Sequence, residues 1–167
     1  MTGAELLADG FGRVREVVHE VLEEATADDL AARLDAEANS IAWLVWHLTR
    51  VQDDHVAAVA GTDQVWTSGW SARFALPLEE SDIGYGHRPE QVAAVTAGAE
   101  ALGGYHDDVY RATLRYLGTL TDADLGRVVD EHYDPPVTLA VRLVSVLADD
   151  LQHAGQAAYL RGLLQRR

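Results

Sequence analysis

Apolar residues recur at three- and four-residue steps near the start of the chain, from about Ala4 to Ala25. Such a repeat places the apolar side chains on one face of an α-helix. The positions concerned are Leu7, Phe11, Val14, Val18, Val21, Leu22 and Ala25. A second helix is predicted from Ile41 to about Ala60, because Asn39 and Ser40 suit its N-terminal cap and Gly61 suits its end.

Between the second and third predicted helices the periodicity breaks down. The segment from Gly61 to Arg88 combines tryptophan, glycine and proline with no sustained repeat. A connection this long within a compact domain is usually functional or packs as a lid, and it is long enough to cross over a bundle. The third helix is predicted to begin at Pro89, where the missing N–H does no harm, and to continue unbroken to Gly118.

One more long periodic segment follows. Thr121–Asp124 resembles the capping box of a short helical turn. Val128–Tyr133 is expected to be extended but is too short to change the fold class. The fourth helix is predicted from near Val137 or Thr138 to about Leu164. Four long helices without a convincing β-hairpin predict an all-α fold: one four-helix bundle domain over residues 1–167, with a long loop between helices two and three.

Composition narrows the classes of protein to consider. Apolar residues make up 48% of the 167 residues and charged residues 24%, which is typical of a globular protein. The net charge is −14, a field that disfavours nucleic acid and anionic lipid as partners. No apolar run reaches the roughly 18 residues of a membrane span, and the N-terminus does not resemble a secretory signal. A cytoplasmic protein is therefore expected.

Three residues stand out as candidate metal ligands. Asp149 and His153 lie four apart on the fourth predicted helix, so both side chains share one face. His47 lies within the apolar run Ile41–Leu48, where an unpartnered imidazole would be costly. Spacing alone does not decide the matter. A histidine on an apolar face is more often a hydrogen-bonded core residue, and an Asp-His pair at this spacing is more often a surface pair.

Three segments resemble one known superfamily. Asn39–His55 resembles the second helix of the DinB-like superfamily, in the branch related to mycothiol-dependent maleylpyruvate isomerase. Asp149–Gln156, followed by Leu160-Arg161-Gly162, is similar to the fourth-helix motif of that superfamily, His-(Ala/Arg)-Gly-Gln and then aromatic-Leu-Arg-Gly. Asp82–His87, ahead of a predicted helix start, fits the same branch. The resemblance covers nearly the whole chain.

The resemblance implies a metal site. Members of the superfamily are four-helix bundles that bind one divalent ion, zinc or nickel, through one histidine on helix two and two ligands four apart on helix four. In this chain those positions are His47, Asp149 and His153. Many relatives have histidine at the position of Asp149, whereas the isomerase branch has a carboxylate. The resemblance also implies homodimers that form through helix faces.

Three protein ligands leave a tetrahedral ion one position short, which is typical of catalytic sites. An ion with an open position can activate a thiol or a water molecule. The chain has no cysteine, so any thiol must come from a cosubstrate. All 13 basic residues are arginine, which indicates GC-rich codons and associates the protein with mycothiol. The predicted function is a metal-dependent S-transferase or thiol-assisted isomerase, in which a metal-bound thiolate or water attacks a small electrophile.

Several other residues could support such a site. Asp54 lies seven after His47 and could orient its imidazole, or it could be a solvated acid. Gln156 could line the pocket or contact a neighbouring helix. Trp70 and His87 could cover the site or be structural loop residues. His55 and His106 are expected to be surface or interface groups. Trp43 and Trp46 are expected to be core residues. No catalytic base is assigned.

Two alternatives remain open. The first is a non-catalytic metal-binding stress or regulatory bundle, in which a fourth protein ligand such as Asp54 or His87 seals the ion. The second is a ferritin-like di-iron protein, which requires Glu-x-x-His motifs on two helices and a lone Glu on each of the other two. Glu16–His19 fits that motif and Asp150–His153 only loosely, while helix two has no Glu.

Overall fold

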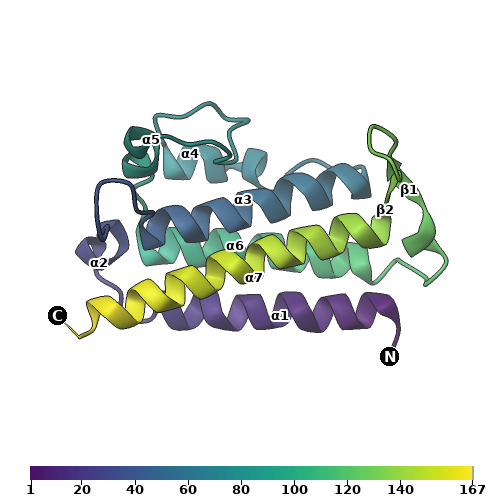
Figure 1. Cartoon of the computed structure of the whole chain (residues 1–167), viewed down its shortest axis with the longest axis horizontal. Helices are drawn as coiled ribbons and strands as arrows, with labels where there is room; N and C mark the ends of the chain where they lie inside the picture. Colours follow the sequence, from purple (N-terminus) through teal and green to yellow (C-terminus); the bar gives the residue numbers. More distant parts are fainter. Residues whose placement is uncertain (167) are drawn as a thin grey trace.

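Four long helices dominate the computed structural model, which describes residues 1–166; Arg167, the last residue of the expected domain, lies outside the described residues. The helices are α1 (Gly3–Leu22), α3 (Ile41–Ala60), α6 (Ala99–Leu117) and α7 (Leu139–Leu164), and they lie side by side in Figure 1. The predicted all-α, four-helix bundle is confirmed. The ends of α3 also match the prediction, because Ser40 caps its first turn and Gly61 ends it in a left-handed conformation with φ of 69°.

Short elements connect the long helices. They are α2 (Ala27–Ala31), η1 (Trp66–Ser68), α4 (Trp70–Phe74), α5 (Pro89–Ala94), η2 (Asp124–Gly126), β1 (Val128–Asp130) and β2 (Val137–Thr138). The strands β1 and β2 pair antiparallel, so the segment ahead of α7 does contain a small hairpin that the sequence pattern did not reveal. Two strands of this length leave the fold class unchanged.

The prediction of one continuous third helix from Pro89 to Gly118 is wrong. The helix ends after Ala94, and the next one, α6, begins at Ala99 with Gly98 as its N-cap in an extended conformation. The apolar spacing runs through the break, because Val92, Val95 and Leu102 are all buried. The β-branched pair Val95-Thr96 followed by Gly98 has low helix propensity, and this local weakness allows the chain to turn there.

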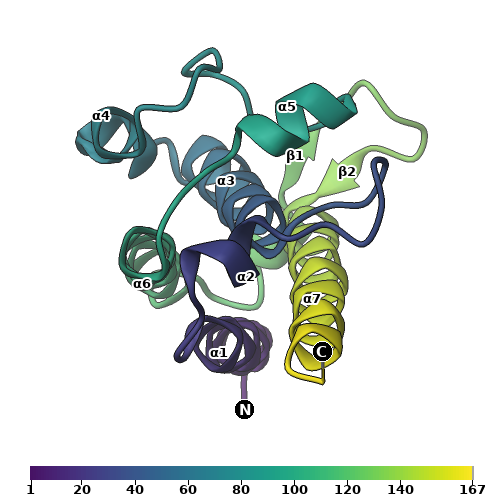
Figure 2. The same ribbon diagram turned by 90° about the vertical axis from the view of Figure 1, so that its left-hand side faces the viewer.

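The segment 61–98, called here the crossover segment, connects two helices that run in the same direction. Figure 1 shows α3 and α6 parallel to each other and antiparallel to α1 and α7. Paired side chains agree that α3 is parallel to α6 and antiparallel to α7: Thr49–His106, Gln52–Thr113, His47–His153 and His55–Arg142. The loop after the second long helix is thus a crossover, as its length suggested, and α7 packs between α3 and α1 (Figure 2).

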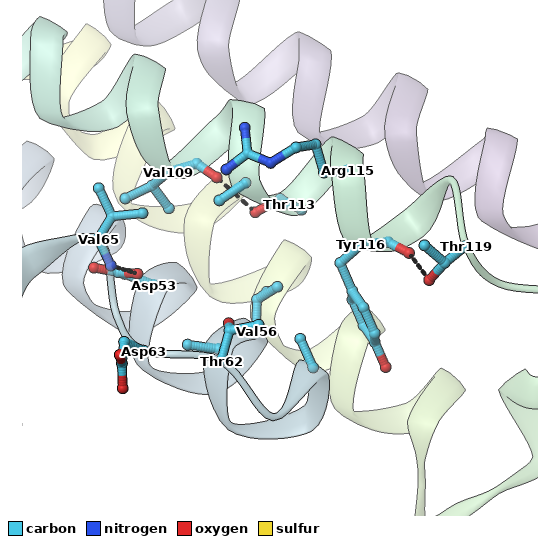
Figure 3. A pocket seen from close by; sticks show the side chains of 13 residues that line it. Asp53, Val56, Thr62, Asp63, Val65, Val109, Thr113, Arg115, Tyr116 and Thr119 are labelled. Carbon is cyan, nitrogen blue, oxygen red and sulfur yellow. Dashed lines mark hydrogen bonds between the residues drawn. The ribbon is translucent and has the colours of Figure 1, made fainter. Parts of the chain in front are cut away.

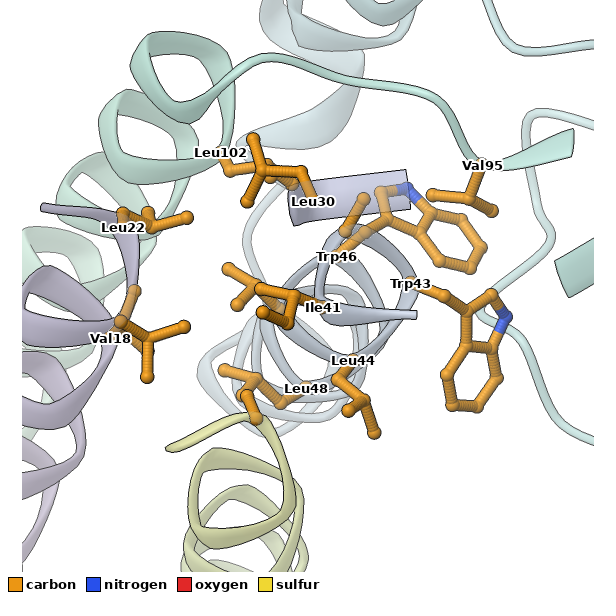
Figure 4. Close-up of a cluster of buried hydrophobic side chains, with 14 of the residues drawn as sticks. Val18, Leu22, Leu30, Ile41, Trp43, Leu44, Trp46, Leu48, Val95 and Leu102 are labelled. Carbon is orange, nitrogen blue, oxygen red and sulfur yellow. The ribbon is translucent and has the colours of Figure 1, made fainter. Parts of the chain in front are cut away.

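Helix α3 is the most enclosed helix of the bundle. Of its twenty residues, fifteen are buried, including charged ones such as Arg50 and Asp53. A helix that is apolar nearly all round is typical of a bundle interior. Figure 4 shows its first half surrounded by side chains from α1, α2 and the start of α6, with Val95 of the crossover segment close to Trp46 and Trp43. The residues of α3 are therefore held from every side.

Arg50 and Asp53 attach the crossover segment to α3. The guanidinium of Arg50 donates hydrogen bonds to Gln64 and to the carbonyl oxygen of Asp82, and it lies over the ring of Trp66. The carboxylate of Asp53 accepts bonds from the backbone N–H groups of Val65 and Trp66, at 2.9 and 2.8 Å. The crossover segment is thus attached to α3 at residues 64–66 and again at Asp82.

Among residues 1–166, none of the helices has the length and apolar character that crossing a membrane requires.

Candidate metal centre

The structure brings the three predicted ligands together. His47 is on α3, and Asp149 and His153 are one turn apart on the neighbouring antiparallel helix α7. One potential ligand atom from each residue lies within 4.8 Å of the other two. The two imidazole rings are 4.7 Å apart between centroids and nearly perpendicular. Of the residues that the structure describes, this is the one group of three or more His, Asp or Glu side chains gathered closely enough for an ion.

The hydrogen bonds of the two histidines leave the same ring nitrogen free in each. Nδ1 of His47 meets the backbone oxygen of Ile83, and Nδ1 of His153 meets the backbone oxygen of Asp149 at 2.8 Å. A carbonyl oxygen only accepts hydrogen bonds, so Nδ1 must carry the proton in both rings. Each Nε2 then has a free lone pair, which is the arrangement that a metal-ligating histidine requires.

Asp149 supplies the anionic member of the group. Its Oδ2 is buried and accepts no hydrogen bond, although Nδ1 of His153 lies 3.3 Å away in poor alignment. Burial alone would raise the pKa of Asp149, but His153 and His47 outweigh it, and the pKa lies below its ordinary value. A buried, ionised oxygen without a partner is expensive unless a cation faces it. Two imidazole nitrogens and a carboxylate oxygen are also ligands that suit zinc and nickel.

The same carboxylate influences the imidazoles. Burial lowers the pKa of His47, and the nearby His153 lowers it further, which keeps the ring neutral. Burial would also lower the pKa of His153, but the carboxylate and backbone oxygens of Asp149 raise it above its ordinary value. His153 therefore stays protonated to a higher pH than His47, a metal ion must displace that proton in order to bind, and affinity should fall in acid.

Adjacent Asp150 has a different environment. Its side chain is fully buried in the bundle, neither carboxylate oxygen has a hydrogen-bond partner, and burial raises its pKa well above the ordinary value. Asp150 is not part of the ligand group. Glu16 is exposed, and His19 pairs with Asp107 on α6. The two motifs considered for a di-iron site thus point to separate places, and that alternative is wrong.

The crossover segment positions His47 through its backbone. Gly84 has φ of 98°, a conformation that L side chains rarely adopt, and a Cβ there would lie 2.5 Å from Nδ1 of His47. Only glycine lets the chain pass this close to the imidazole and place the carbonyl of Ile83 on it. Asp82 supports the turn by accepting a bond from the N–H of Gly84. Sequence reasoning missed this contact and named Asp54, which could equally have been a solvated acid, as the candidate for the orienting role.

Asp54 does not orient His47. Its Oδ1 accepts a hydrogen bond from Gln64 at 2.7 Å, while Nδ1 of His47 is occupied by Ile83. Gln156 is exposed and makes no hydrogen bond in the described structure. Trp70 is hydrogen-bonded to Asp108 and lies against α6, so it does not cover the site.

Aromatic side chains form a wall behind the ligands. Trp43 stacks on His47 at 4.5 Å between centroids and approaches His153 with its edge, while its indole N–H donates to Nδ1 of His87. The other nitrogen of His87 bonds the carboxylate of Asp82 at 2.9 Å. His87 is thus a buried structural residue that ties the crossover segment to α3. Trp43 and Trp46 are core residues as predicted, and Trp43 additionally holds the imidazoles in place.

An open groove adjoins Asp149 between α3 and α7. It has a volume of about 530 Å³, and its floor consists of valines, with Tyr85 of the crossover segment and Tyr133 of the hairpin at its rim. Arg142 lies at the end away from His153 and is bonded to Asp130 at 2.9 Å. His55, expected at the surface, is half-buried and lines this groove, where Arg142 lies 3.3 Å from its Nδ1. Of the three candidate ligands Asp149 lines the groove, and Tyr85 of the groove lies against the ring of His47.

His106 was expected at a surface or an interface and is instead buried between α6 and α3. Its Nδ1 bonds the hydroxyl of Thr49, whose own proton goes to the carbonyl of Val45. Burial lowers the pKa of His106 to about 4. It has no connection to the metal centre and serves as a neutral core group.

A second pocket lies on the opposite side of α3. It has a volume of about 420 Å³ and is lined by α3, α6 and the start of the crossover segment (Figure 3). Its deepest polar groups are Asp53 and Thr113, and both already have partners: Asp53 bonds Val65 and Thr113 bonds Val109. Since these groups have partners, the pocket contains nothing comparable to the free ligand atoms near Asp149.

Comparison with known proteins identifies the family and a solved structure of the same fold. The profile of the mycothiol-S-transferase family matches residues 6–166. A conserved protein of Enterococcus faecalis, known from its crystal structure, is 31% identical and superposes with a TM-score of 0.92, over 100% of this chain and 99% of that one. Among curated proteins, none matches the chain significantly. The chain therefore belongs to the mycothiol-S-transferase family, within the DinB-like superfamily.

Proposed function

We propose that this protein is a divalent-metal-dependent S-transferase that joins a low-molecular-weight thiol of the mycothiol type to a small electrophile. The observation that supports it most is the ligand group itself: two imidazoles with free Nε2 atoms and an unpartnered, ionised carboxylate meet beside an open groove. Family membership supports the thiol as cosubstrate. The ion is expected to be zinc, with nickel as the alternative.

Different residues of the chain would hold the metal ion and orient its ligands. His47, His153 and Asp149 would hold the ion, which when bound lowers the pKa of a thiol enough to supply a thiolate at neutral pH. Ile83 and Asp149 keep both Nδ1 atoms protonated through their backbone oxygens. Because the chain has no cysteine, it cannot supply the thiol itself.

The groove favours a small and uncharged electrophile. Its one cationic side chain, Arg142, is already paired with Asp130, so no free positive charge is left to attract an anion. Val51, Val137 and Val141 make much of its surface apolar. An apolar molecule could therefore bind next to Asp149 without leaving buried charges unpaired.

The second candidate is a metal-binding module without catalysis. It requires a fourth protein ligand, and the two residues expected in that role have other partners: His87 bonds Trp43 and Asp82, and Asp54 bonds Gln64. These contacts favour the catalytic interpretation. The open groove beside Asp149 favours it as well.

The test combines metal analysis with an activity screen. Gently purified protein should contain close to one zinc or nickel ion per chain. It should catalyse the addition of mycothiol to uncharged electrophiles faster than the addition of glutathione to the same electrophiles. His47→Ala and His153→Ala should lose both metal and activity. His19→Ala, an exposed histidine on α1, is the matched control and should retain both. Wild-type protein that is metal-free, or metal loss that leaves thiol transfer intact, would contradict the proposal.

A further inference from the structure

The groove contains one half-buried polar group that the proposed reaction does not use, the imidazole of His55. This residue lies on α3 eight positions after His47, which is about 12 Å further along the helix. It lines the groove together with Asp149, toward the end of the bundle where Figure 1 shows the hairpin of β1 and β2. It also borders a smaller hollow of about 380 Å³ beside β1. A molecule that extends from Asp149 along the groove would reach this ring.

The neighbours of His55 determine which of its ring nitrogens carries the proton. Arg142 lies 3.3 Å from Nδ1, and a guanidinium only donates hydrogen bonds. Nδ1 must therefore accept this bond, and the proton is on Nε2. Arg142 is itself held by Asp130 of β1, at 2.9 Å. Burial lowers the pKa of His55, and although Asp54 opposes this shift the pKa stays below its ordinary value, which keeps the ring in this neutral form.

The Nε2–H group of His55 has no hydrogen-bond partner within residues 1–166. The ring is bonded through Nδ1 alone, and Nε2 is not enclosed by protein atoms. The two nitrogens of an imidazole point in different directions, so the Nε2 proton is directed away from Arg142. The hydroxyl groups of the groove belong to the exposed residues Tyr85, Tyr133 and Ser145, and they are hydrated. His55 is therefore a half-buried donor whose orientation is set by its neighbours.

The charges around His55 indicate which acceptor suits this donor. An anionic group would be repelled by Asp54 and Asp149, and the nearby Arg142 is already paired with Asp130. A cationic group carries no lone pair to accept the bond. An uncharged oxygen avoids both costs. We propose that His55 is a specificity-determining residue, whose Nε2–H donates a hydrogen bond to an uncharged oxygen at the end of the electrophile that is remote from its reacting carbon.

The position of His55 along α3 defines the class of electrophile. Two helical turns separate it from His47, so the oxygen must be several bonds away from the carbon that meets the thiol. The valines of the groove suit an apolar body between these two ends. A benzyl halide with a para-acetyl group has this form. In its reaction the thiolate sulfur bonds the benzylic carbon, the carbon–halogen bond breaks, and halide leaves with the electron pair. His55 keeps its proton throughout.

This proposal rests on the proposed function, and substrate preference tests it. Wild-type protein should have a higher kcat/KM, relative to the uncatalysed rate, for para-acetylbenzyl chloride than for para-isopropylbenzyl chloride, which has the same shape without the oxygen. His55→Phe should reduce this preference about 5- to 10-fold, the effect of one lost hydrogen bond, through the KM of the electrophile. His55→Gln should restore most of it, because the amide can accept from Arg142 and donate to the ligand.

Metal content provides the control for these variants. His55 is not a member of the ligand group, so wild type, His55→Phe and His55→Gln should contain equal amounts of metal. An unchanged preference in His55→Phe would overturn the proposal. A rise confined to the KM of the thiol would overturn it as well, because the oxygen would then belong to the cosubstrate.

Binding of unreactive ligands separates this proposal from the proposed function. Para-methylacetophenone has no leaving group, so its binding requires no thiol transfer. It should bind about 5- to 10-fold more tightly than para-isopropyltoluene, and His55→Phe should remove the difference. NMR of isotope-labelled imidazole nitrogens should show a protonated Nε2 in His55 that shifts on titration with the ketone. Persistence of these results in protein that transfers no thiol would contradict the proposed function alone. Equal affinities for both ligands, or a proton on Nδ1, would overturn the role of His55.

Discussion

The two sides of α3 bury polar groups for different purposes. Toward α6 and the crossover segment, Arg50 and Asp53 have partners on every side: Arg50 bonds Gln64, and Asp53 accepts bonds from Trp66 and Tyr105. Toward α7, His47 has one nitrogen bonded and faces His153 and Asp149 across a space with unpartnered ligand atoms. One side uses charge to hold the structure together, and the other leaves charge free for a ligand.

This difference between the two sides of α3 gives a criterion for recognising a functional site, which burial alone does not give. Arg50 and Asp53, 0% and 3% exposed, are about as buried as His47 at 2%, so burial of a polar residue does not identify a functional site. What distinguishes the α7 side is that several unsatisfied atoms converge where a groove opens. A buried charge with all its partners is evidence of structural role, whereas convergent atoms without partners indicate an absent ligand.

The largest expected effect is on the structural side of α3. Asp53→Ala leaves the buried guanidinium of Arg50 without its counter-charge and frees the N–H groups of Val65 and Trp66. Breaking a buried pair in this way costs about 3–5 kcal/mol. Urea unfolding followed by circular dichroism should show this loss. A decrease below about 1 kcal/mol would mean that the network is not essential to the fold.

His106 should make the α6 side sensitive to acid. Its folded pKa of about 4 lies below the ordinary 6.5, so the unfolded chain binds more protons between these values. Stability from this group is present above pH 6.5 and is lost as the pH falls toward 4, by about 3 kcal/mol in all. In His106→Leu the decline of unfolding free energy over this range should be smaller than in wild type. Thr49 keeps its bond to Val45 in the variant, and equal declines would argue against a neutral buried imidazole.

On the α7 side, Gly84→Ala should weaken the metal centre while the bundle stays folded. The new Cβ would collide with Nδ1 of His47 and displace the carbonyl of Ile83. Loss of an orienting hydrogen bond on a metal-ligating histidine typically lowers affinity 10–100-fold. Competition with a chromophoric chelator measures it. Gly86→Ala is the control, since Gly86 also has positive φ but no atom lies near its Cβ position; equal losses in both would point to general strain of the loop.

The smallest effect is expected at Asp54. Asn retains the oxygen that accepts the bond from Gln64, and His47 takes its orienting bond from Ile83. Asp54→Asn should therefore change zinc affinity less than about threefold, below the 10–100-fold typical of an orienting group. The same chelator competition applies. A tenfold or larger loss would restore Asp54 as a partner of His47 and contradict the role given to the backbone.

Sequence reasoning identified the three candidate ligands but not the groups that position them. The ends of α3 were predictable because Ser40 and Gly61 are strong local signals. The break before Gly98 was not, because the apolar spacing continues across it. Every residue has a carbonyl, so nothing in the sequence distinguishes the one at Ile83 that meets His47. Asp149 and Asp150 are neighbours of one type, and the four-residue spacing to His153, together with the family resemblance, singled out Asp149 as the candidate ligand.

The crossover has a consequence for the assembly of the site. The oxygen that orients His47 comes from a residue 36 positions further along the chain, on a segment that must first span from the end of α3 to the start of α6. Contacts of such long range generally form late in folding. We therefore expect ion capture to follow docking of the segment 61–98 during maturation, so that a chain whose crossover has not yet docked retains its metal poorly.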